Sequence, residues 1–221
     1  MCSVWYNNSI KYFREMIFMS EKTRIITIGR RFGSGGRLIG RALAEKLGIG
    51  FFDKELITHA AKESGLCDSF MENFEETPTS SLLYSLVMNA GNGGFFAGKP
   101  IELVAYEAQV NAVRAAAKSG PCVIVGRCAD YILRDDYDVV SVFITASPAY
   151  RTEFTAKREN ISMKEAAQRI VKVDKARASY HNYYAETKWG ASDSYELCIS
   201  SDHLTTDAAA ELIKTYIENR K

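Results

Sequence analysis

Three glycines within four residues, Gly33, Gly35 and Gly36, stand between a short β-branched run and an amphipathic segment. Glycines let backbone N–H groups converge on an anion, and the N-terminus of a following helix adds a favourable dipole. The strict phosphate-loop pattern G-x-x-x-x-G-K-[ST] is absent, and a tight turn without a ligand is the alternative. A simple turn needs fewer glycines, so the spacing favours phosphate binding at residues 33–37.

Two further polar residues follow predicted strands. Asp53 ends the run that contains Phe51 and Phe52, and Arg127 lies two residues beyond the run 122–125. The carboxyl ends of parallel strands meet at one edge of a sheet, where ligands bind. A guanidinium can grip a phosphate with two hydrogen bonds, so Arg127 is a candidate anion ligand. Asp53 fits a binding residue and a helix N-cap equally well.

The segment 151–177 is strongly basic. It carries eight Lys or Arg against four acidic residues, a local charge of +4 in a chain of +1. A solvated helix face is the ordinary meaning of such a run, and a lid that closes over bound phosphate is the functional one. Tyr180 and Tyr184, which follow, share a helical face, and we expect them to pack the helix rather than to stack on a base.

Composition limits the partners and the compartment. The 221 residues are 47% hydrophobic and 25% charged, typical of an ordinary globular domain. A net charge of +1 argues against a dedicated nucleic-acid-binding protein, and no apolar run is long enough to predict a membrane span. Five cysteines without a C-x-x-C pair favour a reducing cytoplasm. Cys122 and Cys198, in apolar runs, are predicted core residues.

Apolar runs of strand length alternate with helical segments. Strands are predicted at 24–28, 51–53, 122–125, 139–144 and 197–199, and helices at 37–47, 54–64, 101–118, 147–158, 162–188 and from 206 onward. Such alternation predicts an α/β fold with a parallel sheet that is covered by helices on both faces.

Taken in order, these motifs resemble the cytidylate kinase-like proteins, a branch of the P-loop nucleoside monophosphate kinases. The resemblance runs from about Arg24 to the C-terminus and rests on the segments 28–37, 51–57, 125–130, 142–148, 174–189 and 197–201. It implies a P-loop NTPase-like five-stranded parallel sheet with a helical lid. It also implies transfer of the γ-phosphoryl group of ATP, with Mg²⁺, to a nucleoside monophosphate such as CMP or dCMP.

The resemblance assigns roles to individual residues. The ATP-binding set would be Gly33, Ser34, Gly35, Gly36, Arg37 and Leu38. The acceptor-binding set would be Asp53, Arg127, Asp174 and Arg177, and the catalytic set would be Arg37, Arg127, Arg158 and Arg177. No residue is assigned to the metal.

The loop departs from the cytidylate kinase pattern, which is roughly G-x-x-G-x-G-K-G-T. Gly36 occupies the position of the lysine, and Leu38 that of the magnesium-facing threonine. Cys128 stands where the family has an aspartate after Arg127. Phosphoryl transfer needs positive charge on the β- and γ-oxygens, so a different side chain must supply it, with Arg37 the nearest.

Three functions stay open on this basis. The chain is a nucleotide kinase, a nucleotide-binding regulatory protein that has lost catalysis, or a kinase of another small metabolite. We expect one domain over 21–221, with an acceptor-side insertion at 67–100 and a lid at 150–190. Residues 1–20 are predicted to be an N-terminal extension; the alternative is an aromatic helix that packs on the domain or on a second subunit of a homodimer.

Overall fold

The computed structural model describes residues 22–53 and 101–220, and the expected extension at 1–20, helix at 54–64 and insertion at 67–100 lie outside these ranges. The described strands are β1 (Arg24–Arg30), β2 (Gly50–Phe52), β3 (Cys122–Val125), β4 (Asp138–Thr145) and β5 (Leu197–Ser200). The helices are α2 (Gly36–Leu47), α6 (Ile101–Lys118), α7 (Ala129–Leu133), α8 (Pro148–Glu159), α9 (Met163–Tyr184) and α10 (Thr206–Asn219), with a 3-10 turn at Ser192–Ser194.

The five strands form one parallel sheet in the order β2-β3-β1-β4-β5, which confirms the predicted fold class. β1 is central: Ile26 pairs with Val123 of β3 on one side and with Val140 of β4 on the other. Because every strand runs the same way, the loops after all five emerge at one edge. The glycine-rich loop, Asp53 and Arg127 therefore share that edge.

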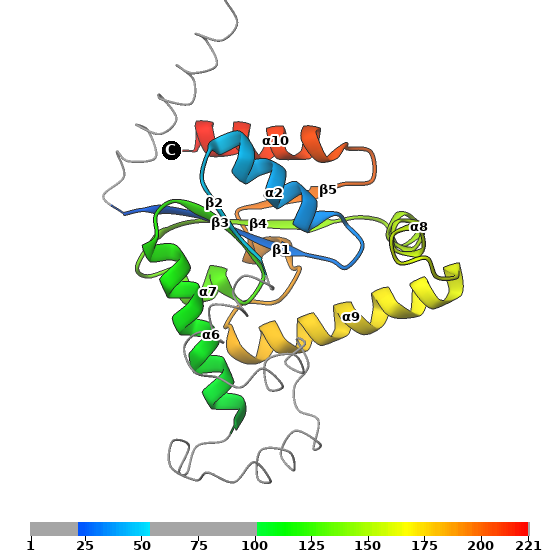
Figure 1. The fold of residues 1–221 in the computed structure, drawn as a ribbon, viewed down its shortest axis with the longest axis horizontal. Coiled ribbons are helices and arrows are strands. Elements are labelled where there is room, and N and C mark those ends of the chain that lie inside the picture. Colours follow the sequence, from blue (N-terminus) through cyan, green and yellow to red (C-terminus); the bar gives the residue numbers. More distant parts are fainter. Residues whose placement is uncertain (1–21, 54–100, 221) are drawn as a thin grey trace, which may run out of the picture.

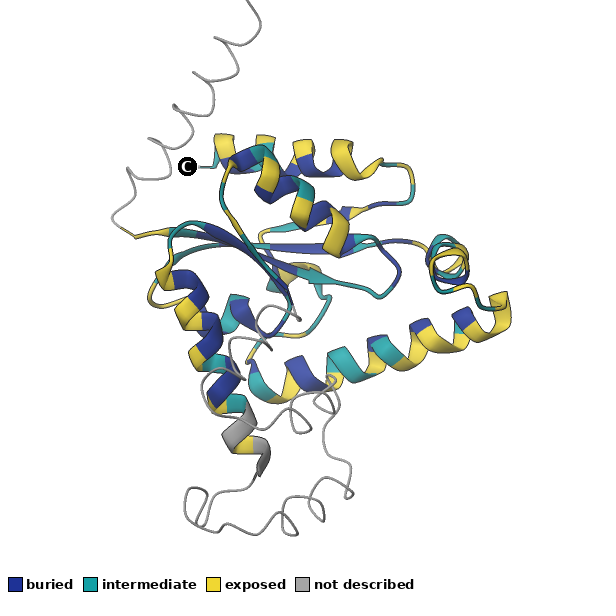
Figure 2. Cartoon of the chain, viewed as in Figure 1, coloured by how far each residue is buried: buried dark blue, intermediate teal, exposed yellow. Residues whose placement is uncertain are grey.

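Each face of the sheet carries its own core (Figure 2). Ile26 and Ile28 pack with Leu43 of α2 and Ile213 of α10 on one face. Ile25 points to the opposite face, into a cluster that α6 and α7 supply. This alternation follows from the two-residue period of a strand, and burial on both faces explains why the strands are continuously apolar.

Two basic helices, α8 and α9, extend beyond the end of the sheet (Figure 1). The Ser147 hydroxyl accepts the N–H of Tyr150 at the start of α8, and Pro148 takes the first helical position. Ser162 and Glu165 form a capping box that begins α9. No helix of the described residues is long and apolar enough to cross a membrane.

Three expectations need correction. α9 ends at Tyr184 rather than near residue 188, because the next residue, Ala185, has an extended backbone. The short helix α7 was not anticipated, because its single turn is too brief to show a period. Cys198 is exposed, since its position on the edge strand β5 points away from the core. Tyr180 is buried and packs against Tyr184, as predicted.

Candidate functional site: a glycine loop between the sheet edge and the basic helices

The glycine-rich loop leaves β1 and enters α2 through two left-handed residues. Gly33 has φ 79° and Gly35 has φ 73°, values that strain any residue with a Cβ. A Cβ on Gly33 would also lie 2.7 Å from the carbonyl oxygen of Arg151. Gly35 caps α2 and has no side chain to accept a hydrogen bond from the first turn. The first N–H groups of α2 therefore have no side-chain cap, the condition in which the N-terminus of a helix can bind an anion.

Ser34, predicted to contact ATP, points into the protein. It is 1% exposed, and its hydroxyl lies 2.9 Å from the carbonyl oxygen of Arg31 and 3.1 Å from that of Ile144. The Ser34 carbonyl accepts a hydrogen bond from the hydroxyl of Ser201 at 2.8 Å. Ser34 is thus held against β4 and the end of β5, and because its N–H also donates to the Arg31 carbonyl at 3.3 Å, its role is to shape the loop.

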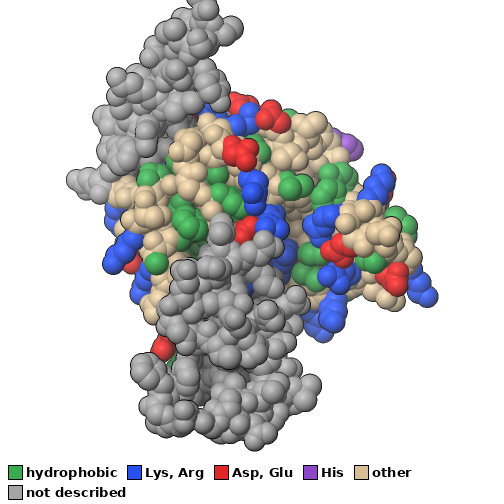
Figure 3. All heavy atoms as spheres, in the orientation of Figure 1, with side chains coloured by type: hydrophobic (Ala, Val, Ile, Leu, Met, Phe, Trp, Pro, Cys, Tyr) green, Lys and Arg blue, Asp and Glu red, His purple; other side chains and the backbone are tan. Residues whose placement is uncertain are grey.

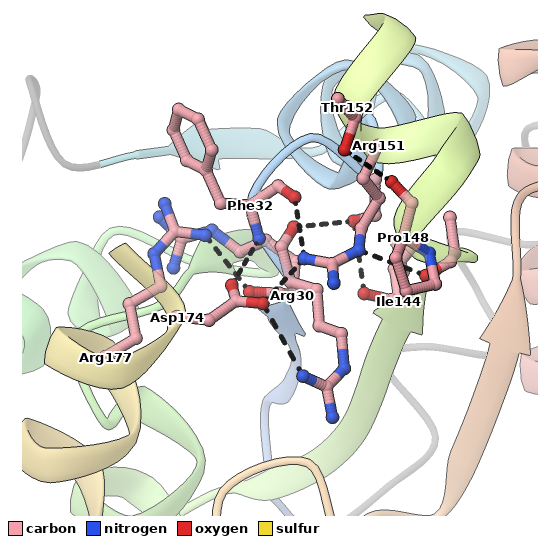
Figure 4. A network of polar contacts seen from close by, with 11 residues as sticks. Arg30, Phe32, Ile144, Pro148, Arg151, Thr152, Asp174 and Arg177 are labelled. Atoms are coloured by element: carbon pink, nitrogen blue, oxygen red, sulfur yellow. Dashed lines mark hydrogen bonds and ion pairs between the residues drawn. The ribbon is translucent and has the colours of Figure 1, made fainter. Parts of the chain in front are cut away.

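A buried ion pair ties the loop to both basic helices (Figure 4). Asp174 of α9 accepts the N–H of Phe32 at 2.7 Å and the Nη1 of Arg151 of α8 at 2.6 Å. Arg151 donates to the Phe32 carbonyl at 3.2 Å as well. Asp174 and Arg151 are 8% and 6% exposed. The family resemblance placed Asp174 on the acceptor base, whereas here its carboxylate orders the phosphate loop.

The two residues expected to serve different substrates contact each other. Arg37 Nε donates to Asp53 Oδ2 at 2.7 Å, and Arg41 lies 3.9 Å from the same oxygen. Asp53 is 3% exposed, while the Arg37 side chain is about half exposed. Leu38, at the position of the magnesium-facing threonine, is 48% exposed and offers no ligand atom.

Arg127 is buried behind the loop in an unusual conformation. It has φ 61°, is 6% exposed, and donates from Nη1 to Gln109 of α6 at 3.1 Å. Gln109 in turn donates to the Arg127 carbonyl at 3.3 Å. A left-handed residue other than glycine costs about 1–3 kcal/mol and is typical of ligand sites.

Three arginines line one cavity at this edge. Arg30, Arg127 and Arg177 surround a space of about 30 Å³, which has room for water but not for a nucleotide. Arg30 passes beneath two glycines: a Cβ at Gly36 would lie 2.7 Å from Arg30 Cβ, and one at Gly126 would meet its guanidinium. The glycine in the lysine position therefore makes room for an arginine from β1.

A coupled acid and base lie at the far end of this cavity. Burial raises the pKa of Asp130 and lowers that of His181, and the attraction between the two groups opposes both shifts. His181 Nε2 lies 2.9 Å from the hydroxyl of Thr187. Both residues line the cavity, and we give them no role in phosphoryl transfer.

Lys and Arg side chains gather around α8 and the adjoining end of α9 (Figure 3). Arg158 of α8 and Arg177 of α9, both predicted to be catalytic, meet at the ring of Phe32 in the loop. The structure thus brings these two arginines to the loop, whereas the partner of Arg37 is Asp53.

Sequence reasoning missed three residues of this site: Phe32, Gln109 and Arg151. Arg151 was counted only as part of a basic run, although its place one turn inside a helix that follows the edge of the sheet was readable. Phe32 carried a signal as well, because an aromatic residue between the glycines and an arginine pair is unusual for a solvent-exposed loop. Nothing local indicated Gln109.

The parallel sheet, with a glycine loop between β1 and α2, has the architecture of the P-loop kinase fold. The cytidylate kinase-like family model matches residues 25–203, so the chain belongs to that family, whose members are kinase-like phosphotransferases. No curated protein matches the sequence.

Solved structures agree on the fold. An uncharacterized protein from Eubacterium ventriosum is 32% identical, with a TM-score of 0.67 over 89% of this chain and 99% of that one. TT1252 from Thermus thermophilus is 16% identical, with a TM-score of 0.52 over 89% and 98% of the two chains. The shikimate kinase from Acinetobacter baumannii, solved with shikimate, is 14% identical, with a TM-score of 0.50 over 90% and 94%.

Proposed function

We propose that this protein transfers the γ-phosphoryl group of ATP to a nucleoside monophosphate. The observation that carries the proposal is the loop at residues 33–36, with Gly33 and Gly35 left-handed and the first turn of α2 open to an anion. The basic helices α8 and α9 stand on its other side. Catalysis of phosphoryl transfer is mostly positioning and electrostatic stabilisation, which backbone N–H groups and arginines supply.

We place the triphosphate of ATP at the loop, where its charge would be met from α8 and α9. Arg158 and Arg177 are already beside the loop at Phe32. Arg37 is the less suitable source, because its guanidinium is engaged by Asp53. An arginine is a planar fork rather than a point charge, so it would bridge two phosphate oxygens.

The loop does not fit a protein-held magnesium ion. Leu38 has no ligand atom, the Ser34 hydroxyl is turned inward, and Asp53 is paired with Arg37. The residues that the structure describes contain no cluster of three His, Cys, Asp or Glu that could hold a metal. We therefore derive no step through an ion bound by the protein; Mg²⁺ would enter as part of the MgATP complex.

For the acceptor we propose the edge of the sheet around Arg127 and Asp53. The left-handed backbone at Arg127 and its support by Gln109 aim one guanidinium at the cavity that Arg30 and Arg177 also line. Because that cavity is water-sized, an acceptor phosphate would enter it only if α9, which carries Arg177, moves outward.

The experiment is a panel of nucleoside monophosphates offered with MgATP in a coupled assay of ADP release. We expect turnover on at least one of them and a slower rate for Arg177→Ala. A chain that binds ATP but releases no ADP with any of these acceptors would reject the nucleoside monophosphate kinase and leave the regulatory protein and the kinase of another small metabolite. The pairing of Arg37 with Asp53 is the observation that favours that alternative.

A further inference from the structure

The ring of Phe32 is surrounded by three guanidinium groups. Arg158 of α8 lies 5.1 Å from the ring centroid, and Arg177 and Arg169 of α9 lie 5.4 and 5.9 Å from it. All three distances fall in the range of cation–π attraction. One loop side chain thus collects arginines from both basic helices at the entrance to the glycine loop.

The backbone of Phe32 is fixed at the same time. Its N–H is held by Asp174 and its carbonyl by Arg151, both buried. The backbone that carries the ring is therefore hydrogen-bonded to side chains from both α8 and α9 (Figure 4). Arginine side chains are flexible and lose rotamer freedom when they bind a ligand. An aromatic ring attached in this way holds them in place before the ligand arrives.

The charge of Arg158 and Arg169 is only partly neutralised. Glu159 accepts from Arg158 at 2.8 Å and from Arg169 at 2.7 Å, so one carboxylate serves both of these guanidinium groups. Three like charges gathered in one place repel one another, and the face of an aromatic ring offsets only part of that repulsion. A ligand with several negative oxygens completes the arrangement.

From these contacts we infer that Phe32 is a positioning residue that assembles Arg158, Arg169 and Arg177 into a site for the polyphosphate tail of a nucleotide. This inference rests on the proposed function for its biological ligand. The loop has no lysine, and in this inference the arginines around Phe32 supply the positive charge instead. Arg169, which no motif had indicated, is one of them.

The test measures binding of inorganic tripolyphosphate by calorimetry, without acceptor or turnover. Phe32→Leu keeps an apolar side chain but removes the ring, and we expect affinity to fall by about fivefold. Phe32→Tyr keeps the ring and should bind within about twofold of the original protein. Thermal unfolding checks that each variant is folded.

A second pair of variants keeps the inference testable if Phe32→Leu does not fold. Arg169→Ala should weaken tripolyphosphate binding and flatten its dependence on NaCl concentration, a readout that a purely structural role would not change. Arg134→Ala is the matched control, because Arg134 also lies over a ring, that of Tyr131 at 4.2 Å, and pairs with Glu186, but on α7. It should leave binding unchanged.

Equal tripolyphosphate affinities for Phe32→Leu and the original protein, or for Arg169→Ala and Arg134→Ala, would overturn the inference, and so would an original protein that binds no tripolyphosphate. If tripolyphosphate binds as expected while no nucleoside monophosphate is phosphorylated, the proposed function fails and the arginine cluster stands.

Discussion

Arg37 and Asp53 form one ion pair, with Nε and Oδ2 2.7 Å apart, although sequence reasoning gave them to separate ligands. The pair joins the first turn of α2 to the end of β2 along the sheet edge. Since Asp53 is almost fully buried and Arg37 is half exposed, the contact fixes the carboxylate more than the arginine.

A double-mutant cycle of Arg37→Gln and Asp53→Asn should give a coupling energy of about 1 kcal/mol in urea unfolding, a value lowered by the exposure of Arg37. The cycle of Arg41→Gln with Asp53→Asn is the control, because Arg41 is 3.9 Å away and should couple more weakly. Equal couplings for the two arginines would show that the contact is not specific.

The buried ion pair of Asp174 and Arg151, which holds the backbone of Phe32 and is called the Phe32 clamp below, should contribute strongly to the free energy of unfolding. Asp174→Asn leaves Arg151 as a buried cation without its counter-charge, and the expected loss is about 3 kcal/mol in urea unfolding. Glu153→Gln, which breaks the exposed pair with Lys157 on the same α8, should leave the unfolding free energy unchanged. The account of the Phe32 clamp is wrong if both variants unfold at the same urea concentration.

Introducing a lysine at position 36, where related loops have one, should destabilise the protein. Gly36→Ala places a Cβ 2.7 Å from Arg30 Cβ, and we expect a loss of about 1–2 kcal/mol. Gly36→Lys should be at least as destabilising and should not raise activity, because it displaces Arg30. Leu38→Thr, at a site 48% exposed, should change stability by less than about 0.5 kcal/mol. A stable, more active Gly36→Lys variant would contradict the role given to Arg30.

Sequence patterns predicted the sheet well because buried parallel strands are short apolar runs, as at Ile25 and Val123. They also predicted the glycine loop, because a left-handed backbone such as that of Gly33 strongly favours glycine. Sequence patterns could not predict which residues the long side chains contact. Asp174 and Phe32 are 142 residues apart, and only the docking of α9 on the loop shows that the carboxylate holds a backbone N–H.

Stability should depend on pH through Asp202, which follows β5 and contacts the residue that begins α8. Hydrogen bonds from the Ser147 hydroxyl, the Ser200 hydroxyl and the Ser147 N–H lower the pKa of its carboxylate from 3.8 to about 2. A lowered folded-state pKa stabilises the protein above pH 3.8, and that contribution is lost as pH falls from 3.8 toward 2. Urea unfolding of Asp202→Asn should therefore show a flatter acid limb, and an unchanged limb would contradict the assignment.

The proposed function is tested most directly by following label from γ-³²P-ATP, with Mg²⁺, into products separated by chromatography, for each common nucleoside monophosphate. The account predicts a labelled nucleoside diphosphate with at least one acceptor, and a higher acceptor KM for Arg127→Lys, since a lysine cannot reproduce a bidentate grip on phosphate. Label that stays in ATP with every acceptor, in a protein that binds ATP, would contradict it.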